Sequence, residues 1–237
     1  MSPVLPEKAR ARLETSAREA ADLYRRMPEV FSQLSAIAET CARALRSGGK
    51  ILFCGNGGSA AESQHLATEF VVRLSSLRER KALPALALTT DTSLLTACAN
   101  DYGFDLVFAR QVEAHLQAGD VLIMLSTSGK SPNLIAAAKA AKARGGITIA
   151  FLGEKSSPLS DLTDLALHIP SASSQRVQEG HLWAGHMLVE LVEQSLFDEP
   201  NAGGGDSWHQ PPHTPAQTQR TRHRKRLSHS FRPLQEY

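Results

Sequence analysis

The sequence has few cysteines and no long apolar run, and both absences exclude classes of protein. Its three cysteines, Cys41, Cys54 and Cys98, are far apart and form no CxxC pair. We therefore expect three buried thiols in a reducing compartment and no disulfide framework. No stretch of about 18 apolar residues is present, so no membrane span is expected. Residues 1–12 lack the charged start and apolar core of a signal peptide, which predicts a cytoplasmic protein.

An excess of charge of one sign is also missing. The formal net charge is +2 over 237 residues, so bulk charge gives no reason to expect nucleic acid as a partner. Residues 198–237 differ in composition, with three consecutive glycines and few aliphatic residues, and 220–232 hold six arginines and lysines and no acid. We predict a folded domain at 1–197 and a disordered basic tail at 198–237. A weak contact of the tail with nucleic acid or a membrane surface is the alternative to a solvated tail.

Hydrophobic periodicity predicts an α/β fold preceded by a pair of helices. Residues 8–47 keep a helical period with a break near Met27-Pro28, and two glycines end the second helix. Short apolar runs then alternate with helix-like stretches. The runs are 51–54, 85–88, 121–125, 147–152 and 165–169, and the helix-like stretches are 59–75, 92–117, 131–144 and 175–197. This alternation predicts a doubly wound, five-stranded parallel sheet of flavodoxin-like type flanked by helices, with ligands beyond the carboxyl ends of the strands.

A glycine-rich turn follows the first predicted strand. Asn56, Gly57 and Gly58 lie between that strand and a helix-like stretch. Glycine lets the backbone approach a ligand closely, and a helix start presents free N–H groups and a positive dipole end. The arrangement suits an anion, although a tight turn without a ligand has a similar sequence. The GxGxxG and P-loop patterns are both absent, which argues against a nucleotide.

A second turn, after the third predicted strand, is rich in hydroxyl groups. Four of them surround one glycine: Ser126, Thr127, Ser128 and Ser131. Ser131 suits an N-cap and Pro132 suits the first position of a helix. Because a single serine is enough for a cap, the four hydroxyl groups favour phosphate binding over capping alone.

Two helix-like stretches carry groups that could bind a metal. His65 and Glu69 lie four residues apart, so both side chains share one face of a helix. They could bind a divalent ion such as zinc, or simply form a surface pair. Gln178 and His186 lie on the last helix, which could bring them toward His65 and Glu69. His115, His168 and His181 are interpreted as structural histidines.

These segments together resemble the sugar isomerase (SIS) domain of the phosphoheptose isomerases. The resemblance covers about residues 8–197 and rests on residues 55–61, 64–65, 69, 100–104, 126–131 and 176–179, in the family's order and approximate spacing. It implies a homotetramer that converts sedoheptulose 7-phosphate to D-glycero-D-manno-heptose 7-phosphate, a precursor of lipopolysaccharide heptose.

The resemblance also implies roles for individual residues. It implies one Zn²⁺ per subunit on four ligands: His65, Glu69, Gln178 and His186. Phosphate contacts fall on Ser126, Thr127, Ser128 and Ser131, and other substrate contacts fall on Asn56, Gly57, Gly58, Glu69, Asn100, Asp101 and Gln178. The acid–base roles fall on Glu69 and His186. Gln175 departs from the acidic residue expected in some members.

The implied reaction moves a carbonyl from C2 to C1 through an enediol. Glu69 would transfer the carbon-bound proton, and His186 would exchange protons with the two oxygens. Two alternatives are a non-enzymatic SIS adaptor that binds a replication-initiator protein, and an isomerase of another sugar phosphate. In the adaptor group some ligand positions are replaced, whereas all four are present here, which favours the enzyme.

Overall fold

The computed structural model describes residues 6–198, so the predicted tail lies outside the described residues apart from Asp198. Five parallel strands form one sheet in the order β2-β1-β3-β4-β5. They are β1 Ile51–Gly55, β2 Ala85–Ala87, β3 Val121–Ser126, β4 Ile147–Leu152 and β5 Leu165–His168. Each of the five predicted runs is a strand, and the predicted doubly wound α/β fold is confirmed.

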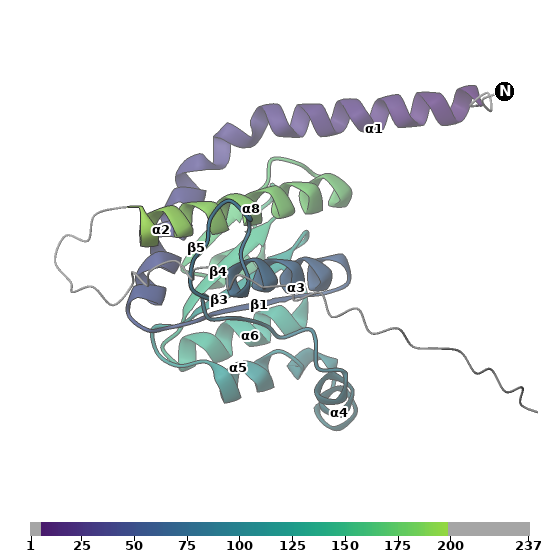
Figure 1. The fold of residues 1–237 in the computed structure, drawn as a ribbon. Coiled ribbons are helices and arrows are strands. Elements are labelled where there is room, and N and C mark those ends of the chain that lie inside the picture. The colour runs from purple at the N-terminus through teal and green to yellow at the C-terminus, as the bar shows by residue number, and fades with distance from the viewer. Residues whose placement is uncertain (1–5, 199–237) are drawn as a thin grey trace, which may run out of the picture.

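Helices cover both faces of this sheet (Figure 1). One face packs mainly against α2 Phe31–Arg46, α3 Gly58–Val71 and α8 Ser174–Phe197. The other packs mainly against α4 Thr92–Tyr102, α5 Ala109–His115, α6 Pro132–Ala143 and α7 Pro158–Leu162. The first helix, α1 Glu7–Arg26, projects from the body and buries one side chain, Leu23. It joins α2 through the 3₁₀ turn η1 Met27–Val30, which contains Pro28 and matches the predicted break.

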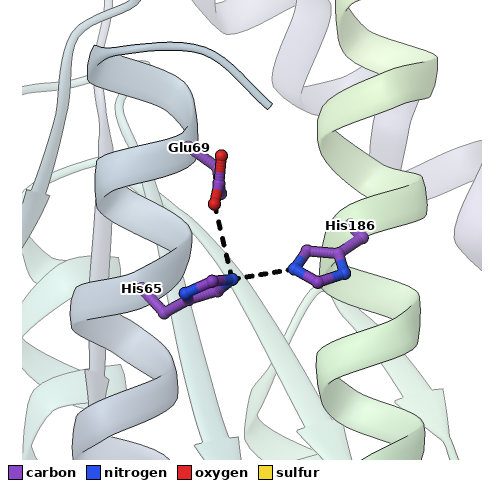
Figure 2. A group of neighbouring side chains, drawn as sticks. All are labelled: His65, Glu69 and His186. Carbon is purple, nitrogen blue, oxygen red and sulfur yellow. Dashed lines mark hydrogen bonds and ion pairs between the residues drawn. The ribbon is translucent and has the colours of Figure 1, made fainter. Parts of the chain in front are cut away.

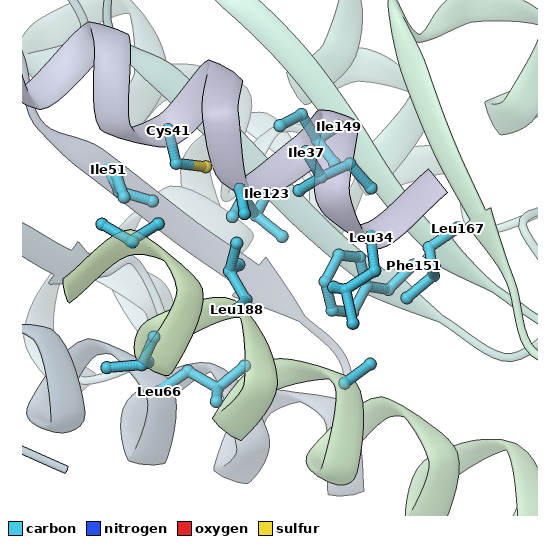
Figure 3. Close-up of a cluster of buried hydrophobic side chains, with 14 of the residues drawn as sticks. Leu34, Ile37, Cys41, Ile51, Leu66, Ile123, Ile149, Phe151, Leu167 and Leu188 are labelled. Carbon is cyan, nitrogen blue, oxygen red and sulfur yellow. The ribbon is translucent and has the colours of Figure 1, made fainter. Parts of the chain in front are cut away.

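The strands are buried on both sides, which explains why their sequences are continuously apolar. In β1, Ile51 and Phe53 pack into the cluster under α2, α3 and α8, whereas Leu52 and Cys54 pack into the cluster on the opposite face. Figure 3 shows the first cluster, in which side chains of the sheet interlock with those of α2 and α8. The sheet is therefore a rigid platform for the loops at its carboxyl edge.

The predicted helix at 92–117 is wrong in one respect, because it is interrupted. The helix α4 ends at Tyr102, and Gly103 has φ +88°, a left-handed conformation that favours glycine. A short 3₁₀ turn, η2 Phe104–Leu106, follows before α5 begins at Ala109. The helix predicted at 59–75 also ends earlier, at Val71.

The three cysteines are buried and free, as predicted. Burial raises the pKa of the Cys41 thiol to about 12, so this thiol stays protonated. Within residues 6–198, none of the helices combines the length and apolarity that a bilayer crossing needs.

Candidate functional site

The two predicted anion-binding turns lie side by side at the carboxyl edge of the sheet. Strand β1 is hydrogen-bonded to both β2 and β3, and the chain leaves β1 and β3 toward opposite edges. This is the topological switch point, where doubly wound sheets bind their ligands. The glycine turn follows β1 and the hydroxyl turn follows β3, so both lie at this switch point.

A pair of amides joins the two turns. Asn56 donates to the side-chain oxygen of Asn133 at 3.0 Å, and Asn133 donates back at 2.8 Å. Asn133 is only 2% exposed, in the first turn of α6. Sequence reasoning missed Asn133, and its one signal was an amide side chain directly after the Ser-Pro start of the helix. The reciprocal bonds fix the spacing of the two turns.

The glycine turn has a backbone that other residues would strain. Gly57 precedes α3 with φ +57°, in the region where L side chains are unfavourable. Gly58 begins α3, and a Cβ atom there would lie 2.5 Å from Nε2 of Gln178. Gln178 therefore packs directly against the start of α3, where Gly57 and Gly58 are exposed.

The hydroxyl turn is held by a hydrogen bond between its own backbone and one of its side chains. Ser126 is buried, and its Oγ accepts from the N–H of Gly129 at 3.0 Å. Gly129 has φ +62°, and a Cβ there would lie 2.0 Å from Oγ of Ser157, so only glycine fits. Ser131 occupies the N-cap position of α6 as predicted, but its side chain makes no capping bond.

A hollow of about 250 Å³ opens beside the hydroxyl turn. Thr127 and Ser128 line it together with Lys130 and Lys155. Lys155, from the loop after β4, was also missed by sequence reasoning. Glu154 also lines the hollow, so two ammonium groups and several hydroxyl groups face one carboxylate, a balance that favours an anion.

His65, Glu69 and His186 converge between α3 and α8, as Figure 2 shows. Nε2 of His65 lies 2.8 Å from Nε2 of His186 and 3.5 Å from Oε1 of Glu69. All three ligand atoms lie within 4.8 Å of one another. Zinc bonds of about 2.0–2.1 Å in tetrahedral geometry place ligand atoms about 3.3 Å apart. The donor set of two imidazoles and one carboxylate therefore fits a divalent ion.

Burial lowers the pKa of His186, and the neighbouring His65 lowers it further, against an opposing effect of Glu69. Neutral imidazole is the form that binds a metal or accepts a proton. The Glu69 side chain is 17% exposed and that of His65 is 45% exposed, so the group remains open to solvent on the His65 side.

The structure places Gln178 away from the other three predicted ligands. Helices α3 and α8 run in parallel, since Gln178 lies against Gly58 and a Cβ on Gly185 would touch Leu66. Eight residues separate Gln178 from His186, which is about 12 Å along a helix axis. Within one chain, Gln178 is therefore grouped with the glycine turn, and His186 with His65 and Glu69.

A second polar contact joins α3 to α8 between these two places. Oε2 of Glu62 and Nδ1 of His181 are buried, face each other at 3.9 Å, and have no hydrogen-bond partner. Burial raises the pKa of Glu62 to about 7, against an opposing hydrogen bond from Ser59. Burial also lowers the pKa of His181 to about 4, while Nε2 of this histidine lies 3.3 Å from the carbonyl of Leu152. Between about pH 4 and pH 7 the contact is therefore largely an uncharged pair.

Asn100 and Asp101 do not contact the other predicted site residues. Both are exposed in the last turn of α4, and Asn100 donates to Asp101 at 2.8 Å. Within residues 6–198, no hydrogen bond or ion pair connects them to the other predicted site residues. Their predicted substrate contacts remain predictions.

Comparison with known proteins matches residues 17–153 to the SIS domain family. The chain is 49% identical over 168 residues to a phosphoheptose isomerase of Burkholderia pseudomallei, covering 71% of this chain and 84% of that one. It is 51% identical over 179 residues to a phosphoheptose isomerase of Roseiflexus sp., covering 75% and 90%. The solved phosphoheptose isomerase of Neisseria gonorrhoeae superposes with a TM-score of 0.72 at 38% identity, covering 78% of this chain and 98% of that one.

Proposed function

We propose that this chain, which belongs to the SIS domain family and within it to the phosphoheptose isomerases, converts sedoheptulose 7-phosphate to D-glycero-D-manno-heptose 7-phosphate. The reaction is a ketose–aldose isomerisation through an enediol and would supply heptose for lipopolysaccharide. The observation that carries the proposal is the convergence of His65, Glu69 and His186 between α3 and α8, the two helices whose N-terminal parts meet at the glycine turn. An adaptor has no need of this acid–base and metal-binding set, so the adaptor alternative is not favoured.

The two turns would hold the phosphate and orient the sugar. The hydroxyl groups of the second turn would donate hydrogen bonds to phosphate oxygens, and the positive dipole ends of α3 and α6 would favour the phosphate charge. We assign this role to Ser126, Thr127, Ser128 and Ser131. Asn56, Gly57, Gly58 and Gln178 would contact the rest of the substrate. Binding energy from the phosphate then orients the reacting end, which is distant from it.

Glu69 would remove the proton from the carbon beside the carbonyl and return it to the neighbouring carbon. Its carboxylate is mostly shielded from solvent, which limits proton exchange with water during the transfer. His186, neutral because of its lowered pKa, would exchange protons with O1 and O2. Because Nε2 of His186 also faces His65, this nitrogen can serve as proton carrier or as metal ligand, but not as both at once.

His65, Glu69 and His186 would hold a divalent ion, which we propose is zinc. A bound divalent ion supplies a Lewis acid that polarises the substrate oxygens. Two imidazoles and one carboxylate are ligands that zinc accepts, and the fourth predicted ligand, Gln178, stays a prediction. The metal is identified by elemental analysis of protein purified without added metal.

We also propose a homotetramer in the cytoplasm. The projecting helix α1 and the start of α2 expose apolar side chains, with Leu13 60%, Tyr24 46% and Phe31 52% exposed. Such surface is typical of subunit contacts. The three free thiols fit a reducing compartment. Light scattering of the purified chain measures the subunit number.

The test is incubation with sedoheptulose 7-phosphate, followed by NMR of the aldose product, with and without a chelator. We expect Glu69→Gln to lower turnover by about 100-fold or more. Glu113→Gln, a matched change in an exposed ion pair on α5, should leave turnover unchanged. Near-normal turnover of Glu69→Gln would refute the assigned base, and absence of product with any divalent metal would refute the isomerase.

A further inference from the structure

Arg80 is a buried cation at the end of the helix that carries His65 and Glu69. Its side chain is only 1% exposed, although it lies in the loop between α3 and β2. The guanidinium donates to three backbone carbonyls: Glu69 at 2.7 Å, Phe70 at 2.8 Å and Lys81 at 3.0 Å. Two of these carbonyls belong to the last turn of α3.

The last carbonyls of a helix have no partner within the helix and carry the negative end of its dipole. A guanidinium that donates to two of them supplies hydrogen bonds that the helix lacks and places a positive charge at the negative end of its dipole. Arg80 therefore fixes the position of the last turn, and one of the two carbonyls belongs to Glu69 itself. The backbone of the proposed base is held directly.

The same guanidinium reaches the other helix of the group. Nε of Arg80 donates to Oε1 of Glu193 at 2.6 Å, and the Glu193 side chain is 4% exposed. Glu193 lies on α8 seven residues after His186, which is two turns along the same helix. Nε of Arg78 lies 3.9 Å from the second oxygen of Glu193, so the carboxylate has cations on both sides.

We infer that Arg80 and Glu193 are positioning residues for the metal centre, which set the distance between Glu69 on α3 and His186 on α8. This inference rests on the proposed function. A buried charge pair has a narrow range of favourable geometry, because either charge left alone in the interior is strongly unfavourable. It therefore restricts how far the two helices can separate or slide, which a hydrophobic contact does less well.

The test measures zinc affinity of metal-free protein by competition with a chromogenic chelator, independently of turnover. Glu193→Gln keeps the shape and removes the charge, and Arg80→Lys keeps the charge and removes the forked geometry. Changes to groups that hold metal ligands in place weaken metal binding by about 10–100-fold, and we expect at least 10-fold for Glu193→Gln. Arg80→Lys should fall between this variant and the wild type.

Asp120→Asn is the matched control. Asp120 is 2% exposed, lies directly before β3, and bonds Lys50 and Gln117, neither of which belongs to α3 or α8. This variant should lower the thermal midpoint and leave zinc affinity within about 2-fold of the wild type. A positioning role predicts that zinc affinity follows the Arg80–Glu193 contact and not the thermal midpoint.

Two outcomes separate the inference from the proposed function. Wild-type protein that binds no zinc, or any other divalent ion, would overturn the metal centre and the inference with it. Wild-type protein that binds zinc, with Glu193→Gln binding it equally well, would overturn the inference alone. Equal loss of affinity in Glu193→Gln and Asp120→Asn would also overturn it, because general stability would then be the cause.

Discussion

Two buried polar contacts join α3 to α8, and they are of opposite electrostatic kind. Glu62 and His181 meet nearer the glycine turn, where desolvation drives both toward their uncharged forms. Arg80 and Glu193 meet beyond the metal-binding group and remain an ion pair. Three backbone carbonyls and a carboxylate surround Arg80, whereas Nδ1 of His181 has no hydrogen-bond partner.

The difference shows that burial alone does not decide the charge of a side chain. A buried charge persists where neighbouring groups replace its hydration, and it is lost where they do not. The uncharged contact of Glu62 with His181 lies nearer the anion-binding turns and adds little to the electrostatic field around a bound phosphate. The charged contact of Arg80 with Glu193 lies nearer the metal-binding group and restrains the distance between α3 and α8 there. The following changes test that division, from the largest expected effect to the smallest.

Arg80→Ala should have the largest effect on stability. It leaves Arg78 as the remaining cation beside the buried Glu193 carboxylate within residues 6–198, and it removes the donor to the Glu69 carbonyl, whereas the Phe70 carbonyl keeps the N–H of Leu83. Removing one partner of a buried pair costs about 3–5 kcal/mol, which denaturant unfolding measures. The double variant Arg80→Met with Glu193→Leu should recover part of this stability but not the zinc affinity. A loss below about 1 kcal/mol for Arg80→Ala would mean that the ion pair is not a strong restraint.

Glu62→Gln should change the pH dependence of stability. The Glu62 pKa rises on folding from 4.5 to about 7, so its contribution to stability falls as pH rises through that range. The His181 pKa falls on folding from 6.5 to about 4, so its contribution rises with pH between those values. Between pH 4.5 and 6.5 these two pH dependences of stability cancel. The folded pair holds one proton, on Glu62, and the unfolded pair also holds about one, on His181.

With glutamine at position 62, only the His181 slope remains. The variant should lose stability on acidification from pH 6.5 toward pH 4.5 more steeply than the wild type, by up to about 1.4 kcal/mol per pH unit. At pH 8, where Glu62 is ionised in the wild type, the variant should be at least as stable. Unfolding free energies at pH 5, 6.5 and 8 measure both effects, with Glu113→Gln as the exposed control. Parallel pH profiles would show that Glu62 and His181 are not coupled in this way.

Gly58→Ala should have the smallest effect on stability and a selective effect on substrate binding. The new methyl group would displace the end of the Gln178 side chain, which is flexible, and alanine favours a helix by up to about 1 kcal/mol. We expect the free energy of unfolding to change by less than about 1 kcal/mol, the KM to rise, and zinc affinity to stay unchanged. Ala61→Ser, an exposed change in the first turn of α3, is the control. Lower zinc affinity in Gly58→Ala would contradict the separation of the glycine turn from the metal-binding group.

Much of the fold could be predicted from the sequence, because the strands are buried on both faces and stand out as short apolar runs. The pairing of His65 with Glu69 could also be predicted, since four residues make one helical turn. The position of Gln178 could not. A spacing of eight residues places Gln178 and His186 on nearly the same face of α8, but two turns apart along its axis.

Contacts between residues distant in sequence were beyond prediction. Asn133 pairs with a residue 77 positions away, and Arg80 with one 113 positions away. Arg80 lies in the run Arg78-Glu79-Arg80-Lys81, and nothing in such a run distinguishes a buried guanidinium from a solvated one. The break at Gly103 was missed because one glycine within a helical pattern is compatible with a continuous helix.

The paired amides of Asn56 and Asn133 also bear on the chemical ageing of the protein. Asn56 precedes Gly57, and asparagine followed by glycine is prone to deamidation because the unhindered backbone nitrogen attacks the side-chain amide carbon and ammonia leaves. The two hydrogen bonds to Asn133 hold the Asn56 amide in one orientation and so oppose that attack. Hydrolysis to aspartate would set a carboxylate against the Asn133 oxygen and beside the anion-binding turns. The bonds that space the two turns thus also protect the anion-binding turns from gaining a negative charge with time.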